Sequence, residues 1–255
     1  MTSFRLKSPQ DINILKEGGH LLAQIMRKLH QAAKPGVSAA FLDELAYRLI
    51  TEAGGRPSFL NYRPDFASQA FPNSLCVSLN ETIVHGIPRK DLILKPGDIV
   101  SLDIGMEYRG LFTDHAITFG LEPITSLERK LIRATRRALM AAIEVAKPNH
   151  NLGDIGYAIE NEAKKNGFKV IRDLTGHGVG YAVHEEPAVF NFGIPGRGLK
   201  LEPGLVIAIE PMLTFSTSNI KEMSDGSFET FDGKKAAHFE HTIALLENKT
   251  IIITQ

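Results

Sequence analysis

Five acidic or histidine residues, each set in a distinctive local sequence, are of the types that bind metal ions. They are Asp103, Asp114, His177, Glu210 and Glu240. Four carboxylates and one imidazole form a hard, oxygen-rich ligand set, which suits manganese, iron(II) or cobalt better than a structural zinc. Two-metal hydrolytic sites hold their ions about 3.5 to 4 Å apart, a separation that one carboxylate can bridge. The set therefore indicates a two-metal hydrolase centre.

The two aspartates lie in a segment with the pattern of a β-hairpin, IVSLDIGMEYRGLFTDHAITF. Two apolar runs flank a short polar turn around Tyr108, Arg109 and Gly110. A turn centred there would place Asp103 and Asp114 opposite each other, where like charges repel unless a cation lies between them. On this segment alone, a solvated hairpin with two surface acids is a competing interpretation.

The other three candidates make the surface interpretation less favourable. His177 lies in TGHGVG, where glycine on both sides lets backbone and ligand approach closely. Glu210 ends the apolar run of LEPGLVIAIEP, and the proline after it stops the strand. A carboxylate buried there needs a cation or a proton. Glu240 lies in HFEHTIALL at a polar-to-apolar strand boundary, with His238 and His241 beside it.

An internal repeat groups these residues further. The segment LKPGDIVSLDIG matches LEPGLVIAIEPM, and the alignment superposes Asp103 on Glu210. Likewise, KPGVSAAFLDELAYRLITEAGG resembles KPNHNLGDIGYAIENEAKKNG. Each copy has a helix N-cap, Ser38 or Asn151, then an amphipathic helix and a glycine. Two copies of one α/β unit are predicted, with a site at their junction.

Together the motifs resemble those of type I methionine aminopeptidases. They are HGIP at 85–88, the two aspartates eleven positions apart, TGHGVG followed by HEEP at 184–187, IEPM at 209–212 and FEHT at 239–242. The match runs from the first helix to the final strand, in the family's order and with closely similar spacing. The resemblance implies an α/β (α+β) protein with the pita-bread fold, a pseudo-twofold pair of α/β halves with a curved antiparallel sheet backed by helices. It also implies a single catalytic domain over residues 1–255.

The resemblance further implies an activity. The enzyme would remove the N-terminal methionine from peptides and nascent polypeptides, preferably when the second residue is small, with two divalent ions of cobalt, manganese or iron(II) per chain. Asp103 would bind one ion, Asp114 and Glu240 would bridge both, and His177 with Glu210 would complete the other. Glu210 would also carry the proton from the attacking water to the leaving amine.

Substrate contacts are implied in the same way. His85 and His184 would hydrogen-bond the scissile amide or the oxyanion. The methionine side chain would enter an apolar pocket formed by Tyr62, Phe71 and Cys76, where its sulfur meets aromatic edges. His238 has no assigned role at this stage. The remaining histidines are expected to be structural or exposed: His20, His30, His115, His150 and His241.

Two features depart from the family pattern. The segment Arg63–Ala70, between Tyr62 and Phe71, is longer than the usual link, and we expect an extended lip on the pocket. An inert surface insertion is the alternative, because long insertions cost little stability. The chain also has no tryptophan, which the family often places on the pocket rim. Alignment from Glu240 backward puts that position at Gly226, with Phe228 as a candidate substitute.

Composition agrees with a soluble enzyme. Lys+Arg and Asp+Glu are both 29 in 255 residues, so no basic field indicates nucleic acid binding. The N-terminus lacks an apolar secretion signal, and no run reaches membrane-spanning length. The single cysteine allows no intrachain disulfide, which fits a reducing compartment. We expect a cytoplasmic monomer. The sequence does not decide whether the protein makes a transient contact with the ribosome.

The elements that must position the site can be placed along the chain. Ser8 and Pro9 start a helix with apolar residues at helical spacing, and a second helix follows Ser38. Further helices are predicted at 126–146 and 152–165, and mainly strands and loops follow. The polar segment 224–235 predicts a surface hairpin or loop near the rim of the site.

Two other functions compete with the methionine-specific one. An X-Pro dipeptidase or aminopeptidase of the same fold could use a similar five-ligand set, but such enzymes usually carry a separate N-terminal domain. The HGIP and FEHT motifs also favour the methionine enzyme. A non-catalytic module that binds a protein partner after losing its metal is the other alternative, and the presence of all five ligands argues against it.

Overall fold

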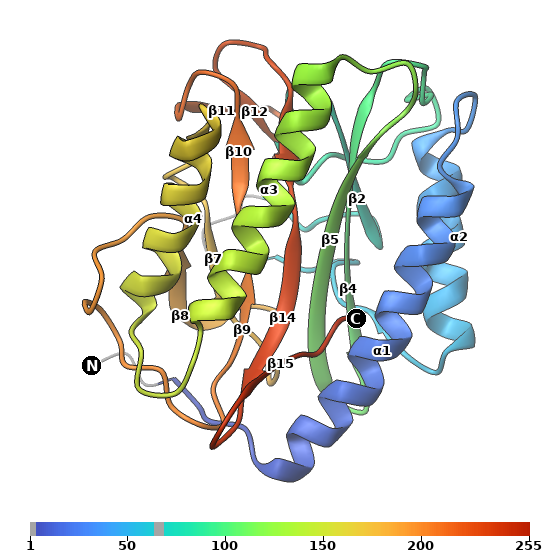
Figure 1. Ribbon diagram of the computed structural model, residues 1–255. Coiled ribbons are helices and arrows are strands. Elements are labelled where there is room, and N and C mark those ends of the chain that lie inside the picture. The colour runs from blue at the N-terminus through green and yellow to red at the C-terminus, as the bar shows by residue number, and fades with distance from the viewer. Residues whose placement is uncertain (1–3, 64–68) are drawn as a thin grey trace.

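Helices cover one face of a large antiparallel sheet in the computed structural model, which describes residues 4–63 and 69–255 (Figure 1). α1 and α2 pack together over one half of the sheet, and α3 and α4 pack together over the other half (Figure 1). The bounds are α1 (Pro9–Ala32), α2 (Ala39–Glu52), α3 (Ser126–Val145) and α4 (Leu152–Asn166). The predicted helices are therefore confirmed, with ends that differ by one residue for α3 and α4.

The main sheet has the strand order β1-β4-β5-β14-β9-β7-β8, with β2 on β4 and β15 on β14. Its strands are β1 (Arg56–Pro57), β2 (Leu75–Leu79), β4 (Ile99–Tyr108), β5 (Leu111–Gly120), β7 (Thr175–Gly178), β8 (Glu185–Phe190), β9 (Val206–Ile209), β14 (Glu240–Leu245) and β15 (Thr250–Ile252). One smaller sheet joins β6 (Lys169–Val170), β10 (Met212–Thr214) and β13 (Ala236–His238). The other joins β3 (Thr82–Val84), β11 (Ile220–Glu222) and β12 (Phe228–Thr230). Every pairing is antiparallel among these strands.

The amphipathic helices are fixed by caps and by their buried faces. Ser8 and Asp11 form a capping box at the start of α1, which satisfies backbone N–H groups that have no partner inside the helix. Leu22, Met26 and Leu29 of α1 then pack into a core shared with β4. Full burial of such a side chain contributes about 1.5–3 kcal/mol to stability. The strands that carry the candidate site thus rest on a rigid helical layer.

The internal repeat predicted from the sequence is present in three dimensions. Ser38, the N-cap of α2, forms an isolated antiparallel bridge with Ile93, and Asn151, before α4, forms one with Lys200. The segment after each bridge enters a strand of the main sheet, β4 or β9. β4 in the first half and β9 in the second half therefore follow corresponding bridges to the start of a helix, as the repeat predicts.

The predicted opposition of two aspartates across the β4–β5 hairpin is wrong. Arg109 and Gly110 form a two-residue turn with φ values of +52° and +82°, a geometry typical of tight hairpins. The resulting register pairs Asp103 with Ala116, two residues after Asp114 on β5. The two aspartates are diagonal neighbours on one face, at a typical separation of about 7–8 Å. They still point to the same side of the sheet.

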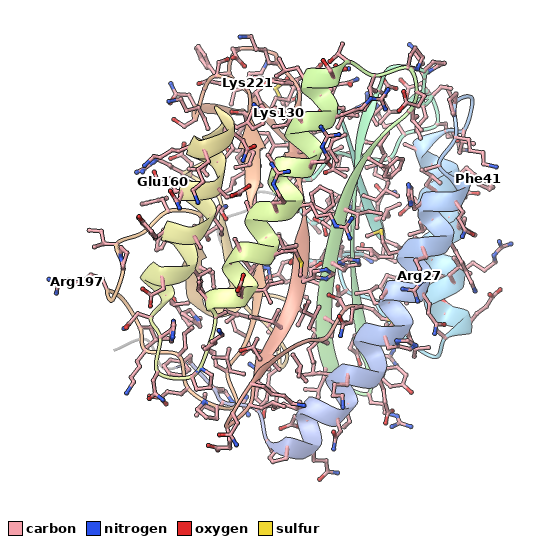
Figure 2. All side chains as sticks on the ribbon, viewed as in Figure 1. Arg27, Phe41, Lys130, Glu160, Arg197 and Lys221 are labelled. Atoms are coloured by element: carbon pink, nitrogen blue, oxygen red, sulfur yellow. The ribbon has the colours of Figure 1, made fainter. Side chains whose placement is uncertain are left out.

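The polar segment 224–235, predicted as a surface hairpin or loop, contains the turn and the second strand of a hairpin whose first strand, β11, precedes it. β11 and β12 pair with each other, and β12 also pairs with β3, which leads directly to His85. Residues 64–68, inside the predicted lip Arg63–Ala70, lie outside the described residues. No helix in the described part of the chain is long and apolar enough to span a membrane. Charged side chains such as Arg27 of α1 and Lys130 of α3 lie on the helical side of the molecule (Figure 2).

Candidate metal centre

Five neighbouring strands each bring one of the candidate ligands to the same place. In sheet order, β4 carries Asp103, β5 carries Asp114, β14 begins with Glu240, β9 is followed at once by Glu210, and β7 carries His177. The register keeps them level, since Asp103 and Glu240 both pair with Ala116. The antiparallel pairing of these strands therefore brings together five candidate ligands that are spread over residues 103 to 240 of the chain.

The side chains meet in one cluster. One ligand atom each of Asp114, His177 and Glu240 lies within 4.8 Å of the others. His177 Nε2 lies 3.6 Å from Glu210 Oε1. Asp103 is close enough for the charges of Asp114 and Glu210 to raise its pKa, in addition to the larger effect of burial. All five predicted ligands are thus brought together.

The electrostatics of the cluster call for a cation. Burial raises the pKa of Asp103 and Glu240 well above their ordinary values, and raises the pKa of Asp114 and of Glu210 to about 7. Asp103 Oδ1 and Glu240 Oε1 are buried and have no hydrogen-bond partner among residues 4–63 and 69–255. Buried carboxylates in this state need protons or metal ions. Oxygen-rich clusters of this kind suit divalent cations, so the residues fit the metal that the sequence predicts.

The candidate histidine ligand is oriented by the backbone of the next residue. His177 Nδ1 donates a hydrogen bond to the carbonyl oxygen of Gly178, at 2.9 Å. The tautomer that makes this bond carries its lone pair on Nε2, the nitrogen that faces Glu210. Such an outer contact is the usual way in which a protein fixes a metal-binding imidazole.

Side chains between the strands fix the central carboxylates. Thr242 Oγ1 accepts a hydrogen bond from the backbone N–H of Asp114 and donates to its carbonyl oxygen, so one hydroxyl bridges β5 and β14. His115 Nδ1 donates to the carbonyl oxygen of Glu240 at 2.7 Å, and its ring stacks on His241 at 4.7 Å. These contacts agree with the structural roles predicted for His115 and His241.

Two further histidines border the cluster. His184 packs edge-on against the ring of His177, with centroids 4.3 Å apart, and its Nδ1 is hydrogen-bonded to the hydroxyl of Tyr62 at 2.8 Å. His85, at φ +59°, packs against the ring of Phe228. Burial lowers the pKa of His85 to about 4 and that of His184 to about 3. Both imidazoles are therefore neutral at pH 7 and can donate one N–H each.

An apolar cluster adjoins these groups. Tyr62, Phe71 and Cys76 lie together, as predicted, and Cys76 is paired with Asp103 across β2 and β4. Sequence reasoning missed three further members, Phe59, Phe112 and Val183. Phe112 could have been found, because it lies two residues before Asp114 on the same strand and must share its face. The other two come from loops, and no periodic signal marks them.

His238 also belongs to this region, although the sequence left its role open. Its Nε2 lies 3.4 Å from Glu210 Oε2. Burial lowers the pKa of His238 to about 4. Its position two residues before Glu240 was the one feature of the sequence that could have placed it near the cluster. That position by itself does not show which way the ring points.

Comparison with known proteins identifies related sequences along the whole chain. A model of "Metallopeptidase family M24" matches residues 13–247. The chain is 40% identical over 250 residues to methionine aminopeptidase 1 of Bacillus subtilis and 41% identical over 250 residues to a methionine aminopeptidase of Clostridium perfringens. Each alignment covers 98% of this chain and 98% of the relative.

Solved structures show the same fold. The methionine aminopeptidase of Thermotoga maritima matches with a TM-score of 0.95 and 37% identity, over 99% of this chain and all of its own. The prolidase of Pyrococcus furiosus matches with a TM-score of 0.78 and 18% identity, over 98% of this chain and 65% of its own. The likeness to prolidase is one of fold alone. The prediction of a pita-bread fold is confirmed.

Proposed function

Since the chain belongs to metallopeptidase family M24 and, within it, to the methionine aminopeptidases, we propose that it removes N-terminal methionine by metal-dependent hydrolysis. Its substrates would be peptides and nascent polypeptides. The observation that carries the proposal is the convergence of one ligand-type side chain from each of five neighbouring strands. Buried carboxyl oxygens without partners support a metal role for this cluster.

The proposal includes two divalent ions, of cobalt, manganese or iron(II). Asp103 would bind one, His177 and Glu210 would bind the other, and Asp114 and Glu240 would bridge them. The strand order supports this division, because β5 and β14 lie between β4 on one side and β9 and β7 on the other. When bound, such ions supply a water of near-neutral pKa and polarise a carbonyl group.

The protein's own groups then handle the proton and the developing charge. Glu210 would take the proton from the attacking water and give it to the leaving amine. His85 and His184 would donate hydrogen bonds to the scissile amide and to the oxyanion, which neutral imidazoles can do. The hydrogen bond between His184 Nδ1 and the hydroxyl of Tyr62, which would orient the ring, supports this role for His184.

The pocket for the first residue would be the apolar cluster around Cys76. Its aromatic rings and thiol offer no partner for a charged side chain, so lysine or glutamate at the first position would be costly to bury. Methionine, unbranched and polarizable, fits such a lining. We also propose that the second residue of the substrate must be small.

The predicted lip remains a proposal. The backbones of Tyr62 and Phe71 are hydrogen-bonded to each other at 2.8 Å, from Phe71 N to Tyr62 O. The segment between them therefore starts and ends at the wall of the pocket. This closure supports an effect of Arg63–Ala70 on substrate preference.

Location and assembly are proposals of the same kind. We propose a cytoplasmic monomer that meets its substrates as they leave the ribosome. A single, buried cysteine agrees with a reducing compartment.

The experiment that tests the function compares the rates at which the protein cleaves several sets of peptides. Protein reconstituted with manganese or cobalt is offered Met-Ala, Met-Gly, Met-Lys and Met-Phe peptides, Lys-Ala and Glu-Ala peptides, and Xaa-Pro peptides. Release of methionine from Met-Ala and Met-Gly is expected to be fastest, with no cleavage of Xaa-Pro bonds. Faster cleavage of Xaa-Pro peptides would favour a proline-specific enzyme of the same fold instead. Equal rates on all four methionine peptides would refute the small second subsite.

A further inference from the structure

His238 presents buried polar atoms that the described residues leave unpaired. It ends β13, and only 1% of its surface is exposed. Within residues 4–63 and 69–255, neither Nδ1 nor Nε2 has a hydrogen-bond partner. An imidazole carries at least one N–H in any protonation state, and a buried N–H without an acceptor is destabilising. The ring therefore needs a partner at this site.

The backbone that carries the ring is held in place on both sides. The backbone N–H of His238 donates to Thr118 Oγ1 at 2.9 Å, and the same hydroxyl donates to the carbonyl oxygen of His238. β13 is also paired with β10, where His238 lies opposite Met212. With its backbone tied to two strands, His238 offers a fixed donor, and its partner must be a group within reach of the ring.

Glu210 places a carboxylate oxygen within such reach. Its Oε2 lies 3.4 Å from His238 Nε2, and its Oε1 lies 3.6 Å from His177 Nε2. Glu210 stands in the link between β9 and β10, outside either strand. A small movement of its side chain would bring Oε2 to hydrogen-bonding distance of the fixed ring. The two oxygens of one carboxylate thus face two different imidazoles.

We propose that His238 is a positioning residue for the metal centre, which donates a hydrogen bond from Nε2 to Glu210 Oε2 and leaves Oε1 for the ion that His177 binds. This inference rests on the proposed function. Metal-binding carboxylates are generally held by hydrogen bonds of this kind, and their loss weakens metal binding or activity about 10- to 100-fold. The Nδ1 atom then remains as a buried acceptor, which proteins tolerate more often than an unpaired donor.

A direct metal-binding role for His238 is the competing assignment. Its Nε2 lies 3.4 Å from Glu210 Oε2, whereas the other carboxylate oxygen, Oε1, faces His177. This arrangement places the His238 ring to donate a hydrogen bond to the second oxygen of Glu210, which favours a donor over a ligand.

The test uses full-length protein, stripped of metal, with His238 replaced by glutamine or alanine and with His150→Gln as the control. His150 is exposed and lies in the turn before α4. Glutamine retains an N–H donor, whereas alanine has none. Calorimetric titration with manganese is expected to give binding about 10- to 100-fold weaker for His238→Ala and close to the original protein for His238→Gln and His150→Gln. Circular dichroism melting of each variant identifies any that fails to fold.

Two results would overturn the inference. One is manganese binding by a folded His238→Ala variant as tight as that of the original protein. The other is loss of an imidazole from the cobalt coordination shell of His238→Gln, measured by X-ray absorption, since this would make His238 a ligand. If His238→Ala does not fold, the cobalt spectrum of His238→Gln still decides between donor and ligand. The comparison needs no turnover, so failure of the original protein to cleave Met-Ala peptides would refute the proposed function separately.

Discussion

Lys7 Nζ lies 2.6 Å from Glu185 Oε2, in a buried ion pair that joins the segment before α1 to the start of β8. The side chain of Lys7 is 1% exposed. The other oxygen of Glu185 accepts hydrogen bonds from the backbone N–H groups of Tyr181 and Ala182. This carboxylate therefore also stabilises the turn formed by residues 181–184. His184 lies within that turn. The N-terminal segment therefore helps to hold a residue that the proposed function places against the substrate.

Replacing Lys7 with methionine is expected to destabilise the protein by about 3–5 kcal/mol, because it leaves Glu185 without its counter-ion in a buried position. For a chain of this size that corresponds to a fall in Tm of roughly 10 °C. Calorimetry or circular dichroism measures it. The matched control is Arg48→Met, which removes an exposed ion pair with Glu52 and should change stability by less than about 1 kcal/mol. Equal Tm values for the two variants would contradict the role given to Lys7.

Glu210→Gln is expected to reduce kcat for Met-Ala peptides by about 10²- to 10⁴-fold, since an amide keeps the shape of the side chain but cannot carry the proton. The Tm of the metal-free variant should stay near that of the original protein. Steady-state kinetics and melting curves measured together separate the two effects. A variant that keeps full turnover would show that another group carries the proton.

His85→Ala tests the division between ligands and substrate contacts. Loss of one hydrogen-bond donor to the oxyanion typically lowers kcat by about 10²- to 10³-fold. Metal content, measured by mass spectrometry of the purified protein, should be unchanged because His85 is not among the proposed ligands. If the variant loses both ions, the assignment of His85 is wrong.

Stability of the metal-free protein should fall as pH rises above about 6.5. The pKa of Asp114 and of Glu210 is raised to about 7, and those of Asp103 and Glu240 are raised well above their ordinary values, so the folded state holds protons that the unfolded state releases near pH 4. This contribution to stability is present below about pH 4 and is lost as pH rises toward the folded pKa values. The loss from Asp114 and Glu210 is nearly complete at pH 7, and the further fall comes from Asp103 and Glu240.

Buried histidines act in the opposite direction, but only at lower pH. The pKa of His85 and of His238 is lowered to about 4 and that of His184 to about 3, so their contribution is lost as pH falls below about 6.5. Between pH 6.5 and 8 the carboxyl groups therefore dominate. Each carboxyl group that stays protonated only in the folded state lowers the free energy of unfolding by about 1.4 kcal/mol per pH unit, or roughly 3–6 °C in Tm. Melting curves with and without manganese check this, and a metal-free Tm that rises from pH 6.5 to 8 would contradict the electrostatics of the cluster.

Much of the site could be predicted because its ligands follow from strand ends and repeats. Asp103 and Glu210 occupy matching places in two copies of one motif, and the structure places them on β4 and at the end of β9, with β5 and β14 between these two strands. The hairpin register could not be read correctly, because it depends on positive φ at Arg109, which is uncommon for a residue other than glycine.

Contacts made by loops were harder to predict. Phe59 and Val183 reach the pocket through tertiary packing that no periodic pattern in the sequence encodes. The place of His238 beside Glu210 likewise results from the pairing of β10 with β13, two short strands that residues 215–235 separate in the chain. Short strands have weak sequence signals, so their partners become known only in the folded structure.

The most direct test of the metal-dependent activity measures methionine release from a Met-Ala peptide while manganese is titrated into exhaustively demetallated protein. No serine or cysteine triad is evident in the sequence, so the hydrolytic water depends on metal. We predict no release without metal, recovery that follows metal occupancy, and loss of activity again on chelation. Full turnover by the demetallated protein would contradict the account.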